Sequence, residues 1–277
     1  MPTFSGTLDV PGGVLHYQVR GTGPLLLISE SGEGDADRSG DLIDHLADTY
    51  SVATYDRRGL SRSRMDHPER GASLAEHADD VHRLLGVLAD APVRMLGCSL
   101  GAVIGLHVAV RHPGEIATLI AHEPVAPRLL PEGERSRHER ELAALQDLYR
   151  REGLGAALPR IARTLGIDPT HKDAEPDLTP QPINERRTAN FDYFIRHDFT
   201  AVIHDTIDVG AVKDVSARII PAVGRTTPQD VFDRRCADAL SALVGQETAE
   251  FPGGHNGNTS HPRAYATRLR QVLADVG

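Results

Sequence analysis

A serine between two glycines is the first residue of the sequence whose surroundings suggest chemistry. The stretch GCSLG, residues 97–101, follows an apolar run and precedes a helical pattern. This context is typical of a nucleophile elbow, a tight strand-to-helix turn in which small residues leave room for an exposed hydroxyl. We therefore interpret Ser99 as a nucleophile, against the alternative of a structural hydroxyl in a turn. The adjacent Cys98 is expected to point away, buried and inert.

A serine nucleophile needs a base, and the histidine best placed for that role is His255 in the stretch EFPGGHNG. This histidine follows the last expected strand, so its loop can bring an imidazole over the sheet. Two rivals are His261, at the entry to the last expected helix, and His122, at the end of a strand. No group of His, Asp or Glu residues has the spacing of a metal site, so we expect no metal and no cofactor.

Strand-like and helix-like patterns alternate around these residues and must position them. A Pro-Gly-Gly turn predicts an N-terminal hairpin, and the continuous apolar runs after it are typical of strands buried on both faces. The expected strands are residues 4–10, 14–20, 24–30, 50–56, 92–98, 116–123, 217–224 and 247–253. The expected core helices are residues 38–49, 74–88 after a capping box at Ser73, 100–112 and 262–275. The order predicts an α/β fold with a mostly parallel sheet and helices on both faces.

The alternation stops between about Pro127 and Val212, where helical stretches and proline-rich connections replace the buried-strand pattern. An all-helical segment inserted into such a sheet is most simply a lid over its ligand-binding edge. We therefore expect a core of residues 1–126 and 213–277 and a helical lid of residues 127–212.

These features together resemble the α/β-hydrolase fold superfamily over nearly the whole chain. The matching segments are the hairpin, the apolar third strand, YDRRGLSRS after the fourth, GCSLG after the fifth, HEP after the sixth and FPGGHNG near the C-terminus. The resemblance implies an eight-stranded sheet, a helical lid after strand six, and the order Ser, acid, His along the chain. A serine at the elbow speaks against the dehalogenase and epoxide-hydrolase branches, which attack with a carboxylate.

The acid of this triad is the least regular part of the match. Members of the family commonly carry it after the seventh strand, where this chain has residues 225–227, Arg-Thr-Thr. Asp230 lies further along, near an expected helix start, and capping is its simpler explanation. Glu123 ends the sixth strand, where some branches place the acid. We favour Glu123 over Asp230, with a backbone or salt-bridge role as the alternative for Glu123.

The oxyanion hole is a second departure. By match to the family motif, its two backbone N–H groups belong to Ser31 and Leu100. Glu30 stands beside the first of them, and a carboxylate aimed into the hole would oppose the developing negative charge. We expect that Glu30 either points away and pairs with an arginine, Arg57 or Arg58, or has a chemical role of its own.

Composition limits the remaining function classes. The 277 residues contain 30 Lys plus Arg and 39 Asp plus Glu, which gives a formal charge of −9. Without a basic stripe, nucleic acid is not an expected partner. Two cysteines provide no disulfide framework, and neither a signal peptide nor a membrane-spanning run is recognisable, so we expect a cytoplasmic protein that does not bind a membrane.

The sequence therefore predicts a cofactor-free serine hydrolase that cleaves a small to medium ester, lactone or related acyl substrate through an acyl-enzyme. A C–C bond hydrolase or lyase on the same scaffold is one alternative. A non-catalytic protein that binds a small molecule is another, because fold and function need not travel together. The sequence leaves open whether the chain forms a homo-oligomer.

Overall fold

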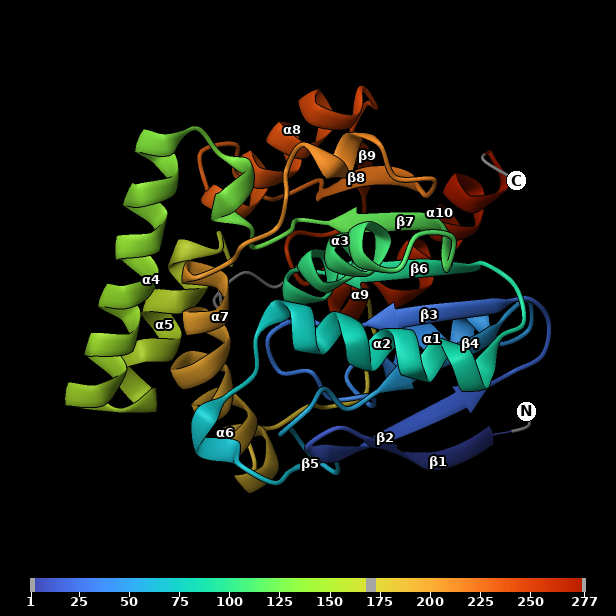
Figure 1. Ribbon diagram of the computed structural model, residues 1–277, viewed down its shortest axis with the longest axis horizontal. Coiled ribbons are helices and arrows are strands. Elements are labelled where there is room, and N and C mark those ends of the chain that lie inside the picture. The colour runs from blue at the N-terminus through green and yellow to red at the C-terminus, as the bar shows by residue number, and fades with distance from the viewer. Residues whose placement is uncertain (1–2, 168–172, 276–277) are drawn as a thin grey trace.

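The computed structural model is an α/β fold in which one sheet lies between two layers of helices (Figure 1). The structure describes residues 3–167 and 173–275, so parts of the expected core (1–2 and 276–277) and lid (168–172) lie outside the described residues. The strands are β1 (Thr3–Val10), β2 (Gly13–Arg20), β3 (Leu25–Ser29), β4 (Ser51–Tyr55), β5 (Arg64–Met65), β6 (Val93–Cys98), β7 (Ile116–His122), β8 (Arg218–Gly224) and β9 (Ala249–Phe251).

The sheet has the expected mostly parallel arrangement. Its main path runs β1-β2-β4-β3-β6-β7-β8-β9, antiparallel from β1 to β4 and parallel from β4 onward. Each of the eight expected strands has a counterpart in this path. The two-residue β5, which pairs with β2, was not expected, because two residues are too few to show a strand pattern.

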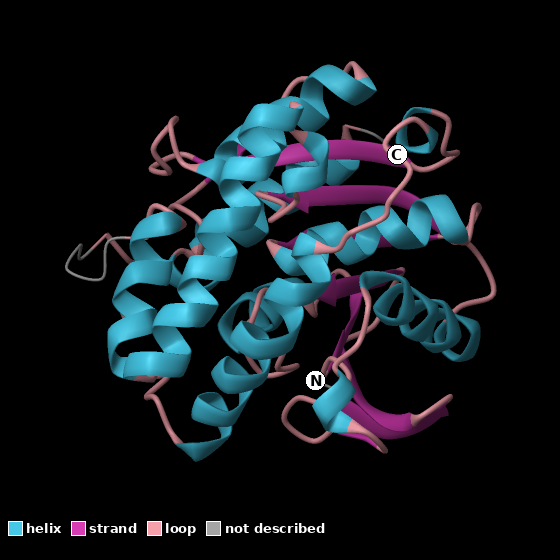
Figure 2. Ribbon diagram, turned by 60° about the vertical axis from the view of Figure 1, so that its left-hand side comes forward, coloured by secondary structure: helices cyan, strands magenta, loops and turns pink. Residues whose placement is uncertain are grey.

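Helices cover both faces of the sheet (Figure 2). The core helices are α1 (Gly40–Leu46), α2 (Leu74–Leu88), α3 (Leu100–Arg111), α8 (Phe232–Val244), α9 (Gly257–Ser260) and α10 (Pro262–Ala274), with the short turn η1 (Pro68–Arg70) before α2. The capping box predicted at Ser73 is present at the start of α2.

Alternating side chains of the central strands divide the core in two. In β6, Met95 packs with α2, α3 and α8 on one face, whereas Leu96 packs with α1 and α10 on the other. Leu119 and Ile120 of β7 divide in the same way. Burial on both faces explains why these strands are continuous apolar runs, and it makes the sheet a rigid support for the loops at its carboxyl edge.

A helical insertion between β7 and β8 lies at the carboxyl ends of the central strands (Figure 1). It consists of η2 (Pro127–Leu129), α4 (Glu132–Glu152), α5 (Leu154–Thr164), α6 (Glu185–Tyr193), the π-helical turn η3 (Phe194–Asp198), α7 (Phe199–Ile203) and η4 (Ala211–Lys213). Within the described residues, every helix is too short or too polar to traverse a lipid bilayer.

Polar contacts attach the later part of this insertion to the core. Buried Asp198 pairs with buried Arg57 at 2.5 Å. The Asn190 amide donates to Ser61, and Thr179 bonds Asp41 on α1. Among the described residues of α5, no such ion pair to the core is present. The buried ion pair between the insertion and the core therefore comes from the carboxyl-terminal half of the insertion.

Candidate active site

The turn between β6 and α3 holds Ser99 in a strained conformation. Its φ of +56° and ψ of −113° lie outside the regions that most residues occupy. A Cβ atom on Gly97 would lie 2.5 Å from the Cα of Ala102, and one on Gly101 would lie 2.0 Å from the Ser29 carbonyl oxygen. The two glycines are therefore required by close approach, as the elbow interpretation predicts. Ser99 is 3% exposed and lines a cavity of about 390 Å³.

His255 lies in the loop after β9 and lines the same cavity as Ser99. Its Nδ1 atom is 2.8 Å from Glu123 Oε2 and 2.5 Å from Asp233 Oδ2. Among the described residues, Ser99 Oγ and His255 are not joined by a hydrogen bond, although such contacts often tighten only when substrate is bound. The loop can approach because a Cβ on Gly224 would lie 2.5 Å from the carbonyl carbon of Gly254.

Glu123 is fully buried at the end of β7 and has a positive φ of +43°. Its Oε1 accepts a hydrogen bond of 2.7 Å from the Gly224 N–H, while Oε2 faces His255. Burial raises the pKa of Glu123, but the hydrogen bond from His255, the nearby charges and the Gly224 N–H more than offset this and lower it to about 2. Glu123 therefore stays ionised.

Asp233 is the residue that the sequence analysis missed. It lies in the first turn of α8 and is fully buried. Like Glu123, it contacts Nδ1 of His255. Burial raises its pKa, His255 opposes this and Glu123 adds to it, so that the pKa lies at about 6. In sequence, an acid in a first helical turn suggests only a favourable interaction with the helix dipole, so the pattern carried no catalytic signal.

The alternative acid, Asp230, is not brought to His255. Its side chain is exposed, and the N-cap position of α8 is occupied by Val231, so Asp230 does not cap this helix either. The carboxylate that reaches the imidazole from this segment lies three residues later, at Asp233.

The two carboxylates determine the charge of the imidazole. Burial lowers the pKa of His255, but Asp233 and then Glu123 reverse the effect and raise the pKa to about 10. The site therefore stabilises an imidazolium strongly, which is the species that a base becomes when it accepts a proton.

The two backbone N–H groups expected to form the oxyanion hole, those of Ser31 and Leu100, have no acceptor within the described residues. The Arg57 guanidinium holds the loop that carries Ser31, because it donates to the carbonyl oxygens of Ser31 and Gly32 at 3.0 and 2.8 Å. The same guanidinium binds Asp198 of η3, so the insertion and the loop share one anchor.

Glu30 does not line the cavity, and the expected pairing with Arg57 or Arg58 is wrong. Its side chain is buried, and its two oxygens have no hydrogen-bond partner among the described residues. Arg57 pairs with Asp198, and Arg58 pairs with Asp80. Burial raises the pKa of Glu30 to about 7, because no neighbouring cation fully compensates the loss of water.

The rival bases lie elsewhere. His122 is buried against the rings of Phe251 and Tyr265, and burial lowers its pKa to about 4. His261 contacts Asp173 at 3.2 Å beyond α9. Cys98 is buried, and burial raises the pKa of its thiol well above the usual range, so it is inert as expected.

The cavity has a polar side and an apolar side. Its polar wall comes from the loop after β3, from the elbow and from the loop after β9. Its apolar wall comes from the insertion, through Leu158, Pro159, Ile161, Ala162, Leu165, Ile167, Phe191 and Phe194. A volume of about 390 Å³ falls within the range of small-molecule sites, so the site accommodates a compound of modest size.

Comparison with known proteins agrees with this fold. Residues 24–200, more than half of the chain, match the family described as alpha/beta hydrolase fold. The chain belongs to the α/β-hydrolase fold family. An uncharacterized hydrolase of Bacillus subtilis strain 168, YraK, is 36% identical to this α/β hydrolase over 277 residues, which cover 99% of this chain and 97% of the relative.

Solved structures share the fold of this α/β hydrolase. A thermophilic esterase from Thermogutta terrifontis superposes with a TM-score of 0.73 at 18% identity and covers 100% of this chain and 99% of its own. A hydrolase from Pseudomonas aeruginosa superposes with a TM-score of 0.69 at 21% identity over 97% of this chain and 98% of its own. At these identities, the likeness shows the fold alone.

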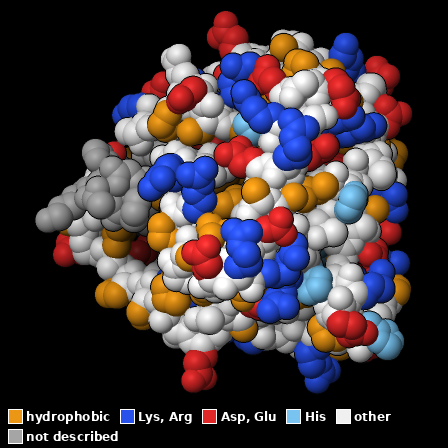
Figure 3. Space-filling view, turned by 90° about the vertical axis from the view of Figure 1, so that its left-hand side faces the viewer, with side chains coloured by type: hydrophobic (Ala, Val, Ile, Leu, Met, Phe, Trp, Pro, Cys, Tyr) orange, Lys and Arg blue, Asp and Glu red, His pale blue; other side chains and the backbone are white. Residues whose placement is uncertain are grey.

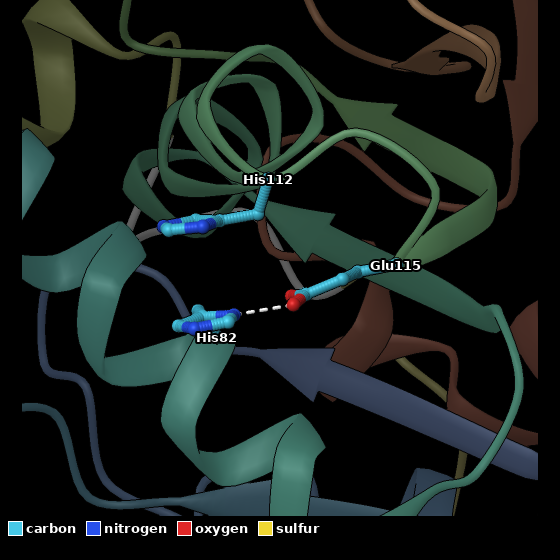
Figure 4. Close-up of side chains that lie close together, drawn as sticks. All are labelled: His82, His112 and Glu115. Atoms are coloured by element: carbon cyan, nitrogen blue, oxygen red, sulfur yellow. Dashed lines mark hydrogen bonds and ion pairs between the residues drawn. The ribbon is translucent and has the colours of Figure 1, made fainter.

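A second group of metal-binding residue types lies outside the cavity of the hydrolase (Figure 4). His82 and His112 stack with ring centroids 4.0 Å apart and planes 4° apart, and Glu115 contacts His82. A metal lies in the plane of each imidazole that binds it, and two parallel planes do not meet at one ion. His112 also hydrogen-bonds Asp79 at 2.8 Å, so these side chains form a partly exposed polar network.

Proposed function

We propose that this α/β hydrolase is a cofactor-free serine hydrolase of small to medium esters, lactones or related acyl compounds. The observation that carries the proposal is that a strained serine and an imidazole with two buried carboxylates line one cavity. Strain at a functional hydroxyl and acids directed at a single histidine are both costly, and a chain that only bound ligands would need neither.

The proposed reaction proceeds in two halves. Ser99 Oγ attacks the substrate carbonyl while His255 takes its proton, and the N–H groups of Ser31 and Leu100 donate to the oxyanion. His255 then returns the proton to the leaving alcohol, which departs and leaves an acyl-enzyme. Water adds to this acyl group with His255 as base, and collapse releases the acid and restores Ser99.

Glu123 is the proposed orienting acid, and Asp233 is a second positioning carboxylate. Glu123 is held by the Gly224 N–H and remains ionised, so it fixes the tautomer in which Nδ1 of His255 carries the proton. Asp233 adds a second negative charge beside the same atom and raises the pKa of the base.

A fluorophosphonate probe tests the proposal. We expect the probe to label the wild-type chain at Ser99, as located by mass spectrometry of the digested protein, and to leave Ser99→Ala unlabelled. Ser99→Ala should also lose turnover of 4-nitrophenyl butyrate with an unchanged circular dichroism spectrum, whereas Ser136→Ala, on the surface of α4, should keep it. Turnover by Ser99→Ala above about a tenth of wild type would remove the assignment.

A further inference from the structure

The charges on the cavity wall do not balance. Apart from His255, the ionisable side chains that line it are Glu33, Arg38 and Arg187, so two cations face one anion. The lid side of the molecule, where α4 to α7 lie, shows basic and acidic side chains interspersed with hydrophobic ones (Figure 3). An unbalanced cation beside an apolar wall points to a ligand that is both anionic and apolar.

Glu33 and Arg187 form an ion pair with each other. Arg187 of α6 donates through Nε and one terminal nitrogen to the two oxygens of Glu33, both at 2.6 Å. Its remaining nitrogen donates to the carbonyl oxygen of Gln181. This forked pair joins the lid to the loop after β3, neutralises the charge of Arg187, and uses three of its five N–H donors within the protein.

Arg38 is the remaining cation. Its Nε lies 3.6 Å from Glu33, and within the described part of the chain its guanidinium makes no hydrogen bond. Its backbone is nevertheless fixed, because its N–H donates to Asp35 and its carbonyl oxygen accepts from the Gln181 amide at 2.9 Å. The side chain is 16% exposed. Arg38 is thus a mostly buried side chain, placed by the backbone, whose terminal nitrogens make no hydrogen bond within the described residues and stay open to the cavity.

We propose that Arg38 binds a free carboxylate of the substrate, so that the acyl compounds this hydrolase cleaves are anionic. The substrate class is an ester or related acyl compound with one free carboxylate and an apolar portion that packs against α5 and α6. This inference rests on the proposed hydrolytic function and specifies its substrate class. A planar guanidinium matches a carboxylate through two parallel hydrogen bonds, and burial strengthens such bonds.

Two matched substrate pairs test the inference. In the first, 4-nitrophenyl hemiglutarate carries the charge on the acyl side and 4-nitrophenyl pentanoate is its neutral counterpart. In the second, 4-acetoxybenzoate carries the charge on the leaving group and 4-acetoxybenzamide is neutral. The readout is the ratio of kcat/KM for the charged to the neutral member. We expect the wild type to prefer the charged member of at least one pair by about 10- to 100-fold, the range of a charge-assisted hydrogen bond.

The variants identify the residue responsible. Arg38→Gln should remove the preference through KM, and Arg38→Lys, which keeps the charge without the fork, should retain part of it. Arg151→Gln removes the same charge from the exposed end of α4 and should leave the ratio unchanged. A wild-type ratio near one in both pairs would overturn the inference, as would an Arg38→Gln ratio equal to that of the wild type.

A binding measurement separates this inference from the proposed function. Ligand-observed NMR titration compares hexanoate with hexanamide, which differ in charge and little in shape. Tighter binding of hexanoate to the wild type, lost in Arg38→Gln, supports the carboxylate site even if no ester is hydrolysed and the proposed function fails. Hydrolysis of neutral esters with equal binding of the two ligands would uphold the function and reject the site.

Discussion

At the scale of single residues, the site concentrates two negative charges on one imidazole. Glu123 and Asp233 both contact Nδ1 of His255, from β7 and α8 respectively. Their pKa values shift in opposite directions. Hydrogen bonds to the ionised form lower the pKa of Glu123 despite its burial, whereas burial raises the pKa of Asp233. This asymmetry gives the two carboxylates different expected roles.

The orienting role of Glu123 predicts a loss of turnover. Glu123→Gln keeps the shape of the side chain but removes the acceptor that selects the productive tautomer, so we expect kcat to fall by about 10²–10⁴. Asp230→Asn is the matched control, because Asp230 is exposed and does not contact His255. Steady-state kinetics on 4-nitrophenyl butyrate measure both. Equal losses in the two variants would argue against the assignment.

The role of Asp233 predicts a shift in pH dependence. A base must be neutral to accept a proton, so activity should rise with pH through the pKa of His255, which the two carboxylates hold at about 10. Asp233→Asn removes one of the negative charges that favour the imidazolium, so this pKa falls and the acid limb of kcat/KM moves to lower pH. The profile of the variant against wild type checks the sign, and an unmoved or raised limb would contradict it.

At the scale of secondary-structure elements, the oxyanion loop depends on the insertion. Arg57 holds the carbonyl oxygens of Ser31 and Gly32, and Asp198 of η3 in turn neutralises Arg57. Both members of the ion pair are buried, with side chains 2% and 1% exposed. Such a pair stabilises little by itself, but its disruption leaves an uncompensated buried charge.

The buried pair of Arg57 and Asp198 predicts that a substitution at Asp198 has a large effect on the free energy of unfolding. Asp198→Asn should lower the free energy of unfolding by about 3–5 kcal/mol, because it leaves Arg57 buried without its counterion. Asp192→Asn, six residues earlier, removes an exposed partner of Arg196 and should cost less than about 1 kcal/mol. Urea unfolding monitored by circular dichroism measures both. A loss of similar size in the two variants would show that burial of the Arg57 pair has no special effect.

At the scale of the whole molecule, the helical insertion packs on one of the two hydrophobic cores of the sheet. The central strands contribute fully buried side chains to two cores, whereas α4 and α5 each bury only a few residues. The contacts that attach the insertion lie mainly after residue 173. Stability is therefore expected to be uneven, with the insertion opening at a lower free energy than the sheet.

Hydrogen exchange measures this difference. We expect amides of α4 and α5 to exchange faster than those of α6 and α7, and all of these faster than the amides of β3, β6 and β7. The reason is that opening the first two helices breaks fewer buried contacts and no buried ion pair to the core. Protection of α4 and α5 equal to that of the central strands would show that the insertion and the sheet unfold as one unit.

The sequence by itself determined the features that depend on neighbours along the chain. The strand and helix periods predicted the mostly parallel sheet with helices on both faces. The spacing of Gly97 and Gly101 around Ser99 predicted the tight turn, because such a turn requires small residues within a few positions. The carboxylate at the tip of β7 was predicted to reach His255, and the structure places Glu123 Oε2 2.8 Å from Nδ1.

Only the tertiary structure decided which distant groups meet. Asp233 of α8 contacts the imidazole of His255 in the loop after β9. Its neighbours in the sequence resemble those of any acid that interacts favourably with a helix dipole. The burial of Glu30 without an arginine partner also depended on tertiary packing, because Arg57 and Arg58 pair with Asp198 and Asp80 instead. The free guanidinium of Arg38 likewise exists because Arg187, 149 residues away, occupies both oxygens of Glu33. Local dihedral requirements are written in adjacent residues, whereas charge pairing is decided by whichever side chains the fold brings within a few ångströms.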